Sequence, residues 1–358
     1  DKAAPELPVS YKDFYNETGR ATRGMAMSVK ARALLYAASK LHNPSHATDK
    51  WEKAAKAAYD IIQTGWYTLP NIDVDPLYDV NGGNVILNSS QLIFERRNND
   101  DNAFESRNLP IGFENGNSGN TPTQNLVDAY EMADGTPFSW ENTKHASKPY
   151  SGRDPRFYKA ILYNEASFMG TKIETFEGGR NASPITGATL TGYYLRKYMN
   201  ETVSLSPTNP IKKPHHFVLF RYAETLLNYA EAMNELGGPD YTADELPISA
   251  RTALNKVRSA ANMPDITDNG DDFTARLRNE RRVELAFEDH RFWDIRRWMI
   301  GDVVKDIYGV KITKKGSKYS YTPTKIQTRV WNEKMNLYPI AQSEIYKNGN
   351  LTQNDGWE

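Results

Sequence analysis

Cysteine is absent from the 358-residue sequence. The chain therefore forms no disulfide bond, and thiol catalysis and thiolate metal sites are excluded. Long apolar runs are missing too, since no stretch approaches the roughly 18–20 apolar residues of a membrane span. The charges nearly cancel, with 44 Lys and Arg against 45 Asp and Glu and a formal net charge of -1. This balance does not point to nucleic acid or to an anionic membrane surface as a partner.

Motifs for catalysis and for nucleotide binding are also scarce. Neither G-x-x-x-x-G-K nor G-x-G-x-x-G occurs, and none of the six histidines lies in an H-E-x-x-H motif. Two carboxylate pairs have the spacing to serve a glycosidase, Glu280 with Glu284 and Glu288 with Asp294. Both pairs lie among arginines on a predicted helix, where ion pairing is the favoured role. The sequence thus predicts no catalytic residue and no enzyme.

Two acidic stretches leave a structural calcium site open as an alternative. Residues 265–272 and residues 98–102 are both rich in Asp and Asn oxygen atoms. The first stretch lacks the bidentate Glu of an EF-hand, and capping of the following helix is its default role. No cofactor and no metal ligand is therefore predicted.

What the sequence does contain is a repeated helical pattern. Apolar residues at spacings of four and three, alternating between large and small side chains, lie on one side of a helix. Such alternation lets two helices approach closely. The pattern occurs twice, at Met27, Ala31, Leu34, Ala38 and Leu41 and again at Leu219, Ala223, Leu226, Ala230 and Met233.

Each pattern is followed by a second predicted helix, at residues 51–62 before Gly65 and at residues 250–260 before Pro264. Ordinary helical hairpins would give the same arrangement, but the likeness of the two halves favours tetratricopeptide-like helix pairs at 20–65 and 216–262. The second pair is expected to open at His215 and His216. Residues 271–300 are predicted to be helical as well, with a bend or a new helix at His290. The predicted fold class is mostly α, an α-α superhelix.

The segments between and after these helices have a different amino-acid composition. Residues 70–213 are dense in Gly, Asn, Pro and Ser, and residues 301–358 form a second loop-rich segment. Short β-hairpins are expected, with strand-like runs at 85–87, 91–95 and 158–163 and a hairpin around Tyr319 and Tyr321. Long irregular insertions inside a compact protein are usually functional. The 70–213 segment is therefore expected to face the ligand.

Aromatic residues in these loops are the candidate ligand-binding residues. An aromatic ring suits the apolar C–H face of a sugar, while Asn, Asp and Arg can hydrogen-bond the hydroxyl groups. The alternative for each ring is that it anchors its own loop to the body of the protein. The candidates are Phe104, Phe113, Asn115, Trp140 and Tyr150.

A series of short motifs occurs in order along nearly the whole chain. They include GRATRG at 19–24, GWYTL at 65–69, PTQNLVDAYEM at 122–132, RDPRFY at 153–158, NERRVELAFE at 279–288, RFWDIRRW at 291–298, LYPI at 337–340 and NLTQNDGW at 350–357. This ordered series resembles the SusD/RagB family of outer-membrane nutrient-binding lipoproteins. The resemblance implies one domain of that family over residues 1–358.

The resemblance also implies a function. Members of the family bind a glycan at the surface of Bacteroidetes-type cells and deliver it to a SusC-like TonB-dependent transporter, without chemistry. The RagB branch is associated with peptides, so a peptide ligand is an alternative. A scaffold that binds only proteins through its helical repeats is a second alternative.

The chain departs from the family pattern at its start. The family begins with a lipoprotein signal and a lipidated Cys, and it carries more chain before the GRATRG motif. We therefore expect part of the N-terminal region, including the lipid anchor, to be missing from this chain and the predicted site to be incomplete. Binding aromatics have no fixed place in the family, so the resemblance does not identify the ligand.

Overall fold

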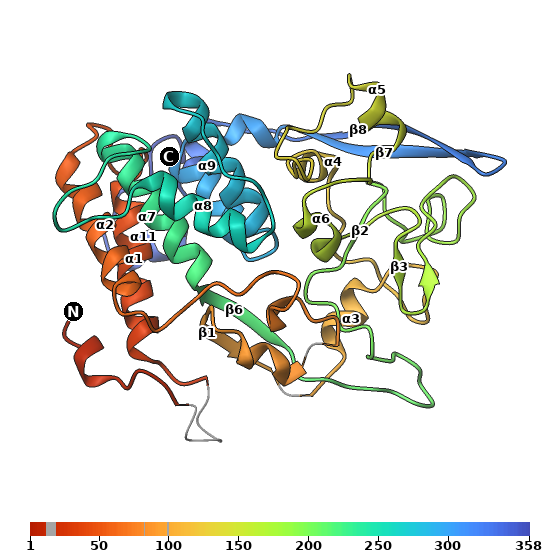
Figure 1. The fold of residues 1–358 in the computed structure, drawn as a ribbon, viewed down its shortest axis with the longest axis horizontal. Coiled ribbons are helices and arrows are strands. Elements are labelled where there is room, and N and C mark those ends of the chain that lie inside the picture. Colours follow the sequence, from red (N-terminus) through yellow and green to blue (C-terminus); the bar gives the residue numbers. More distant parts are fainter. Residues whose placement is uncertain (12–18, 82, 99) are drawn as a thin grey trace.

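The computed structural model describes residues 1–11, 19–81, 83–98 and 100–358. The long helices gather on one side of the molecule, and the loops and short strands gather on the other (Figure 1). A two-stranded ribbon of β1 and β6 lies between these two halves at the lower edge of the view. None of the described helices is long and apolar enough to cross a bilayer.

The helical half is built from the two predicted pairs. The first pair is α1 (Arg23–Ala38) with α2 (Thr48–Ile62), and the second is α7 (Tyr222–Gly237) with α8 (Ala250–Ala260). The helices pack in the order α1, α2, α7 and α8. Alanines at the contacts, such as Ala55, Ala58, Ala230 and Ala253, are completely buried. Because these side chains are small, the helix axes can lie close together. The predicted mostly α fold with paired helices is confirmed.

The predicted helical region at 271–300 consists of two helices. These are α9 (Gly270–Glu284) and α10 (His290–Arg297). Between them Phe287 and Asp289 take left-handed backbone conformations, with φ of 64° and 63°. A right-handed helix cannot continue through such residues. The bend expected at His290 is therefore present.

The second pair does not open at His215 as expected. Residues His216–Arg221 form strand β6, which pairs antiparallel with β1 (Leu92–Arg97), and α7 begins only at Tyr222. Burial alternates along β6, because His216, Val218 and Phe220 face the interior while the residues between them are only half buried. Alternation with a period of two is the pattern of a strand. The helical interpretation of 216–221 was wrong.

Two of the three strand-like runs in the loop-rich half are also different. Residues 85–87 lie in a 3-10 helix, Gly83–Asn88. Residues 158–160 lie at the end of helix α6 (Pro155–Ala160), so only 161–162 of the third run form a strand. The side chain of Asp154 accepts a hydrogen bond from the backbone N–H of Arg156 and so caps α6, and Pro155 occupies its first turn. Both features favour a helix start. The run at 91–95 falls largely on β1, as predicted.

The remaining elements of the loop-rich half are short. They are the helices α3 (Ala103–Asn108), α4 (Gln124–Val127) and α5 (Thr143–Ser147) and the strands β2 (Ile161–Leu162), β3 (Ser167–Phe168), β4 (Thr171–Lys172) and β5 (Tyr194–Leu195). Strand β2 pairs with β5, and β3 pairs with β4. Three-residue and four-residue 3-10 helices lie at Ala4–Glu6, Pro76–Tyr78, Gly301–Val304 and Glu333–Asn336.

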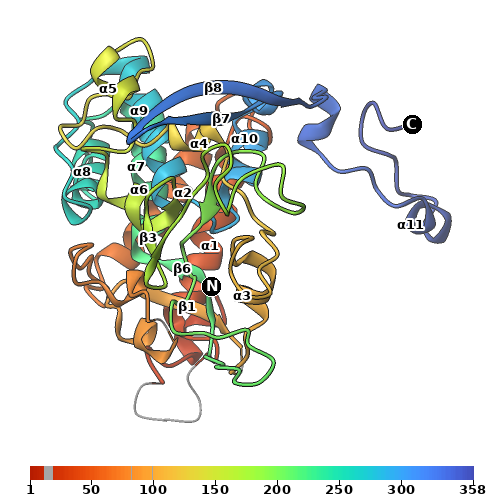
Figure 2. The same ribbon diagram turned by 90° about the vertical axis from the view of Figure 1, so that its right-hand side faces the viewer.

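The C-terminal segment contains the expected hairpin in a longer form. Strands β7 (Asp306–Lys315) and β8 (Lys318–Thr328) pair along their whole length and cross the top of the loop-rich half (Figure 1). Beyond the hairpin the chain projects away from the body and carries the short helix α11 (Gln342–Lys347) (Figure 2).

Candidate functional site

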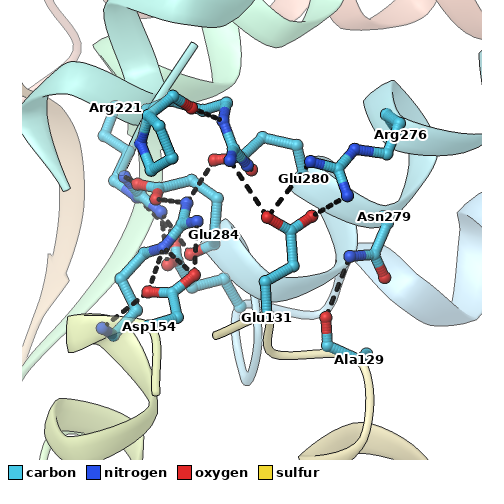
Figure 3. Close-up of polar contacts among 12 residues, drawn as sticks. Ala129, Glu131, Asp154, Arg221, Arg276, Asn279, Glu280 and Glu284 are labelled. Carbon is cyan, nitrogen blue, oxygen red and sulfur yellow. Dashed lines mark hydrogen bonds and ion pairs between the residues drawn. The ribbon is translucent and has the colours of Figure 1, made fainter. Parts of the chain in front are cut away.

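The carboxylates that could have served a glycosidase are buried in ion pairs. Glu280 and Glu284 on α9 are 1% and 6% exposed. Glu284 accepts hydrogen bonds from Arg221 at 2.6 Å and from Arg156 at 2.8 Å (Figure 3). Glu280 accepts one from Arg258 at 2.8 Å and a second from Arg156. All four carboxylate oxygens are therefore engaged by arginines rather than open to a substrate.

The second carboxylate pair has the same surroundings. Glu288 accepts hydrogen bonds from Arg221 and Lys197, and Asp294 accepts them from Arg281 and Arg297. The network ties α9 to α6, α8 and β6. It thus holds the loop-rich half against the helices, which is the ion-pairing role that the sequence favours.

The charges in this network control the protonation of its acids. Burial by itself would raise the pKa of Glu284, but the positive charges of Arg221 and Arg156 outweigh it and lower this pKa to about 2. A general acid needs the opposite, a carboxyl that keeps its proton near neutral pH. The network therefore supports structure, not acid catalysis.

Two side chains of the first calcium candidate contact arginines. Asn269 accepts a hydrogen bond from Arg251 at 2.7 Å, and Asp268 lies 3.7 Å from Arg276. Asn99, in the second candidate, lies outside the described residues. Within the described ranges, no three His, Asp or Glu side chains are grouped closely enough to share a metal ion.

Two adjoining cavities form a ligand-sized hollow in the loop-rich half. Their volumes are about 230 and 270 Å³, and both are lined by Tyr198, His215 and His216. Pro214, His215 and the start of β6 form one wall, and α3 forms another. We call the two cavities together the His215 groove.

Aromatic rings line the His215 groove. Phe104, on α3, lies with its ring centroid 5.6 Å from that of His215. Phe217 lies 6.3 Å from Tyr198, with the two ring planes at 47°. Half-buried rings of this kind offer flat apolar surface to a ligand at little entropic cost.

Polar and charged side chains complete the groove. Nε2 of His215 lies 2.9 Å from the buried carboxylate of Glu105, and Asp101 lies 4.0 Å from Nδ1. Burial lowers the pKa of His215, but the hydrogen bond to Glu105 together with the negative charges of Glu105 and Asp101 outweighs burial and raises this pKa. Arg107, Asn98 and Asp79 add further hydrogen-bonding groups to the lining.

The pKa of the neighbouring histidine is shifted in the opposite direction. Burial and the positive charge of Arg97 lower the pKa of His216 to about 4, so this ring is neutral at pH 7. The groove therefore presents donors and acceptors of both signs together with aromatic faces. Such a surface suits a polyhydroxylated ring, which hydrogen-bonds around its edge and stacks on its face.

Three of the five residues predicted from the sequence lie in or next to the apolar cluster that borders this groove. Phe104 lines it, and both Phe104 and Phe113 pack against one apolar cluster around Leu109 and Phe168. Phe113 meets Phe168 edge to face at 5.5 Å. Asn115 is exposed and donates a hydrogen bond to the backbone carbonyl of Leu205 at 2.9 Å.

The other two lie in a different apolar cluster. Trp140 donates a hydrogen bond from its ring N–H to Asp128 at 3.1 Å and meets Phe138 edge to face. Tyr150 is only 8% exposed, and its ring lies 4.7 Å from that of Tyr163. Ligand contact by any of the five stays a prediction. The burial of Tyr150 favours the anchoring role over ligand contact.

Sequence reasoning missed His215, Tyr198 and Phe217. For His215 and Phe217 the sequence gives little signal, because residues 217–220 are all apolar and only the burial along the folded strand alternates. Tyr198 reaches the groove from the end of the loop-rich segment. No local sequence pattern predicts that Tyr198 lines the groove.

Comparison with known proteins decides the family. Residues 88–357 match the model of the SusD family. The chain belongs to the SusD family. Among SusD-family relatives, it is 27% identical over 245 residues to the SusD-like protein P25 of Formosa agariphila, which covers 66% of this chain. The match spans only 38% of the length of P25.

Solved SusD-family structures share the fold over essentially the whole chain. A SusD-like protein from Bacteroides fragilis has a TM-score of 0.82 at 28% identity, covering 99% of this chain and 69% of its own. A SusD-like carbohydrate-binding protein from the same species has a TM-score of 0.74 at 26% identity, covering 98% and 68%. The fold and family expected from the sequence motifs are thus confirmed.

Proposed function

We propose that this SusD-family chain binds a glycan in the His215 groove. The observation that carries the proposal is the groove itself, which combines half-buried aromatic rings with hydrogen-bonding side chains of both signs. The shared fold with a SusD-like carbohydrate-binding protein from Bacteroides fragilis supports the same ligand class.

In this proposal each wall of the groove has its own role. The ring of Phe104 packs against the apolar face of a sugar. Arg107, Asn98 and Asp101 hydrogen-bond its hydroxyl groups. The ion pair between Arg196 and Glu201, at 2.9 Å, supports the far end of the groove.

Replacing Phe104 with alanine is expected to weaken glycan binding roughly three- to tenfold, the value of one aromatic contact. Affinity electrophoresis in gels that contain a panel of neutral and acidic polysaccharides measures it. Trp140→Ala is the matched variant, because that ring lies outside the groove. If Trp140→Ala weakens glycan binding and Phe104→Ala does not, the site would instead lie in the apolar cluster of Trp140 and Tyr150. Binding of peptides but of no glycan would favour the peptide alternative.

The proposal includes no chemistry on the ligand. We expect the purified protein to release no reducing sugar from any polysaccharide that it binds, because the candidate carboxylates are ion-paired and buried. A colorimetric reducing-end assay over a day at pH 4–8 tests this. Release that disappears in Glu280→Gln or Glu284→Gln would contradict the proposal.

The wider role is part of the same proposal. The full-length protein would be lipid-anchored at the cell surface on the outer membrane and would pass its glycan to a SusC-like TonB-dependent transporter. Co-purification of a transporter with the tagged full-length protein from its native membrane tests this step. If the protein binds a glycan but captures no transporter, only the glycan-binding part of the proposal would stand.

A further inference from the structure

A further cavity lies away from the His215 groove, between the loop that joins β4 to β5 and the β7–β8 hairpin. Strands β7 and β8 lie at the top of Figure 1 and of Figure 2, and α3 and β6, which border the groove, lie below them. The volume of this cavity is about 220 Å³. Sites for drug-sized ligands measure roughly 300–1,000 Å³, so the cavity suits a single sugar ring. We call it the Thr175 cavity.

The walls of the Thr175 cavity are fixed where the loop crosses the edge of β7. The backbone N–H of Val310 donates a hydrogen bond to the carbonyl of Thr191 at 2.9 Å, and that of Glu177 donates one to the carbonyl of Ile312 at 2.8 Å. A Cβ at Gly192 would lie 2.7 Å from Val310, and the φ of Gly192 is +85°, so this close approach requires glycine. The cavity is therefore formed by the folded chain before any ligand arrives.

One polar group in the wall of this cavity is left without a partner. Thr175 lines the cavity and is 7% exposed, and its hydroxyl forms no hydrogen bond among the described residues. The hydroxyl of Thr189, which also lines the cavity, differs because it lies 2.9 Å from that of Thr191. A buried hydroxyl without a partner is destabilising, and a ligand hydroxyl in the cavity would supply the missing hydrogen bond.

The other walls are mainly aliphatic. Leu190 and Ile326 are 71% and 36% exposed, and Ala182 is buried. Among the described residues of the lining, none is aromatic, and the two charged ones, Lys311 and Glu177, form an exposed ion pair at 2.9 Å. Aliphatic side chains suit a methyl group, whereas the flat face of a sugar ring is better matched by an aromatic ring.

We propose that the Thr175 cavity binds a terminal 6-deoxyhexose residue of a glycan. Such a sugar carries a methyl group where other hexoses carry a hydroxymethyl group. The methyl group packs against Leu190 and Ile326, and a ring hydroxyl completes the hydrogen bonding of Thr175. The inference rests on the proposed function for its ligand class, whereas glycan binding in the His215 groove does not depend on this cavity.

Matched sugars isolate the contribution of the methyl group. L-Fucose differs from L-galactose, and L-rhamnose from L-mannose, only in carrying a methyl group in place of the hydroxymethyl group. Saturation-transfer NMR titration of the full chain with the methyl glycosides of these four sugars measures each affinity. We expect at least one 6-deoxy glycoside to bind roughly three- to tenfold more tightly than its matched partner, because its methyl group is buried without desolvating a hydroxyl.

Thr175→Val tests the unpartnered hydroxyl. Because valine keeps the shape of the side chain, the affinity for the preferred 6-deoxy glycoside is expected to fall roughly three- to tenfold, while the urea midpoint of unfolding stays the same or rises. Leu190→Asn should abolish the preference for the methyl group, and it replaces an exposed side chain. Thr313→Val is the matched control, because Thr313 is exposed on β7 and does not line the cavity.

The outcomes separate this inference from the proposed function. Wild-type affinity in Thr175→Val, or equal binding of the two members of each sugar pair, would overturn the inference. If Phe104→Ala abolishes 6-deoxy glycoside binding and Thr175→Val does not, the sugar lies in the His215 groove, which overturns the Thr175 cavity and supports the groove. No binding of any glycoside, with polysaccharide binding that depends on Phe104, would overturn the inference alone. A folded wild type that binds neither glycosides nor polysaccharides would overturn both.

Discussion

Arg221→Ala is expected to lower the free energy of unfolding by about 3–5 kcal/mol. Arg221 is 1% exposed and donates hydrogen bonds to Glu284, Glu288 and Gln91. Without the guanidinium, Glu284 keeps only Arg156 and Glu288 keeps only Lys197, so the buried negative charge is no longer fully compensated, which is strongly destabilising. The effect is large because this one arginine joins β6 to Glu284 at the end of α9 and to Glu288 in the turn that follows.

Urea denaturation followed by circular dichroism measures this change. Lys311→Ala is the control, because its ion pair with Glu177 is exposed and such pairs contribute less than about 1 kcal/mol. Arg221→Met removes the charge but keeps most of the volume. If Arg221→Met is as stable as the wild type, the cost lies in lost packing and the charge argument is wrong.

Acid is expected to unfold the protein as the pH falls from about 4.5 towards 2. The positive charges of Arg221 and Arg156 overcome burial and hold the pKa of Glu284 at about 2, below its ordinary 4.5. Arg297 has the same effect on Glu231, whose pKa is also about 2 although burial opposes it. The unfolded chain therefore takes up these protons at a higher pH than the folded chain does, and acid favours unfolding.

The size of this effect follows from the two shifts. Each carboxylate contributes about 3 kcal/mol that is fully present above pH 4.5 and is lost as the pH falls to the folded pKa. Chemical denaturation at pH 7, 5, 4 and 3 measures it. Glu231→Gln should be less stable at pH 7 and should lose less stability on acidification. An unchanged pH slope in this variant would show that Glu231 is not responsible.

The helix pairs could be predicted because their signal is local. The spacing of Ala31, Leu34 and Ala38 is a property of one helix turn after another, and burying that face against a partner is the only way to keep it from water. The strand β6 could not be predicted with the same ease. Residues 216–221 are extended because they pair with β1, a partner far away in the sequence.

The residues of the candidate site also differ in whether the sequence could predict them. Phe104 could be proposed from the sequence, since an aromatic ring in a polar loop is visible there. His215 and Tyr198 could not, because each gains its role from neighbours on other segments: Glu105 beside His215 and Phe217 beside Tyr198. Burial and charge pairing are properties of the folded chain.

By itself, the sequence determined the helical architecture, the family and the lack of thiol chemistry, because periodicity, ordered motifs and composition are carried along the chain. Only the tertiary structure decided which charges are structural and which surfaces are hollow. Glu284 and Glu95 both lie within two residues of an arginine in the sequence. One meets Arg156 and Arg221 in the fold and becomes part of the core, and the other faces a cavity. That difference depends on which distant segments pack against each residue.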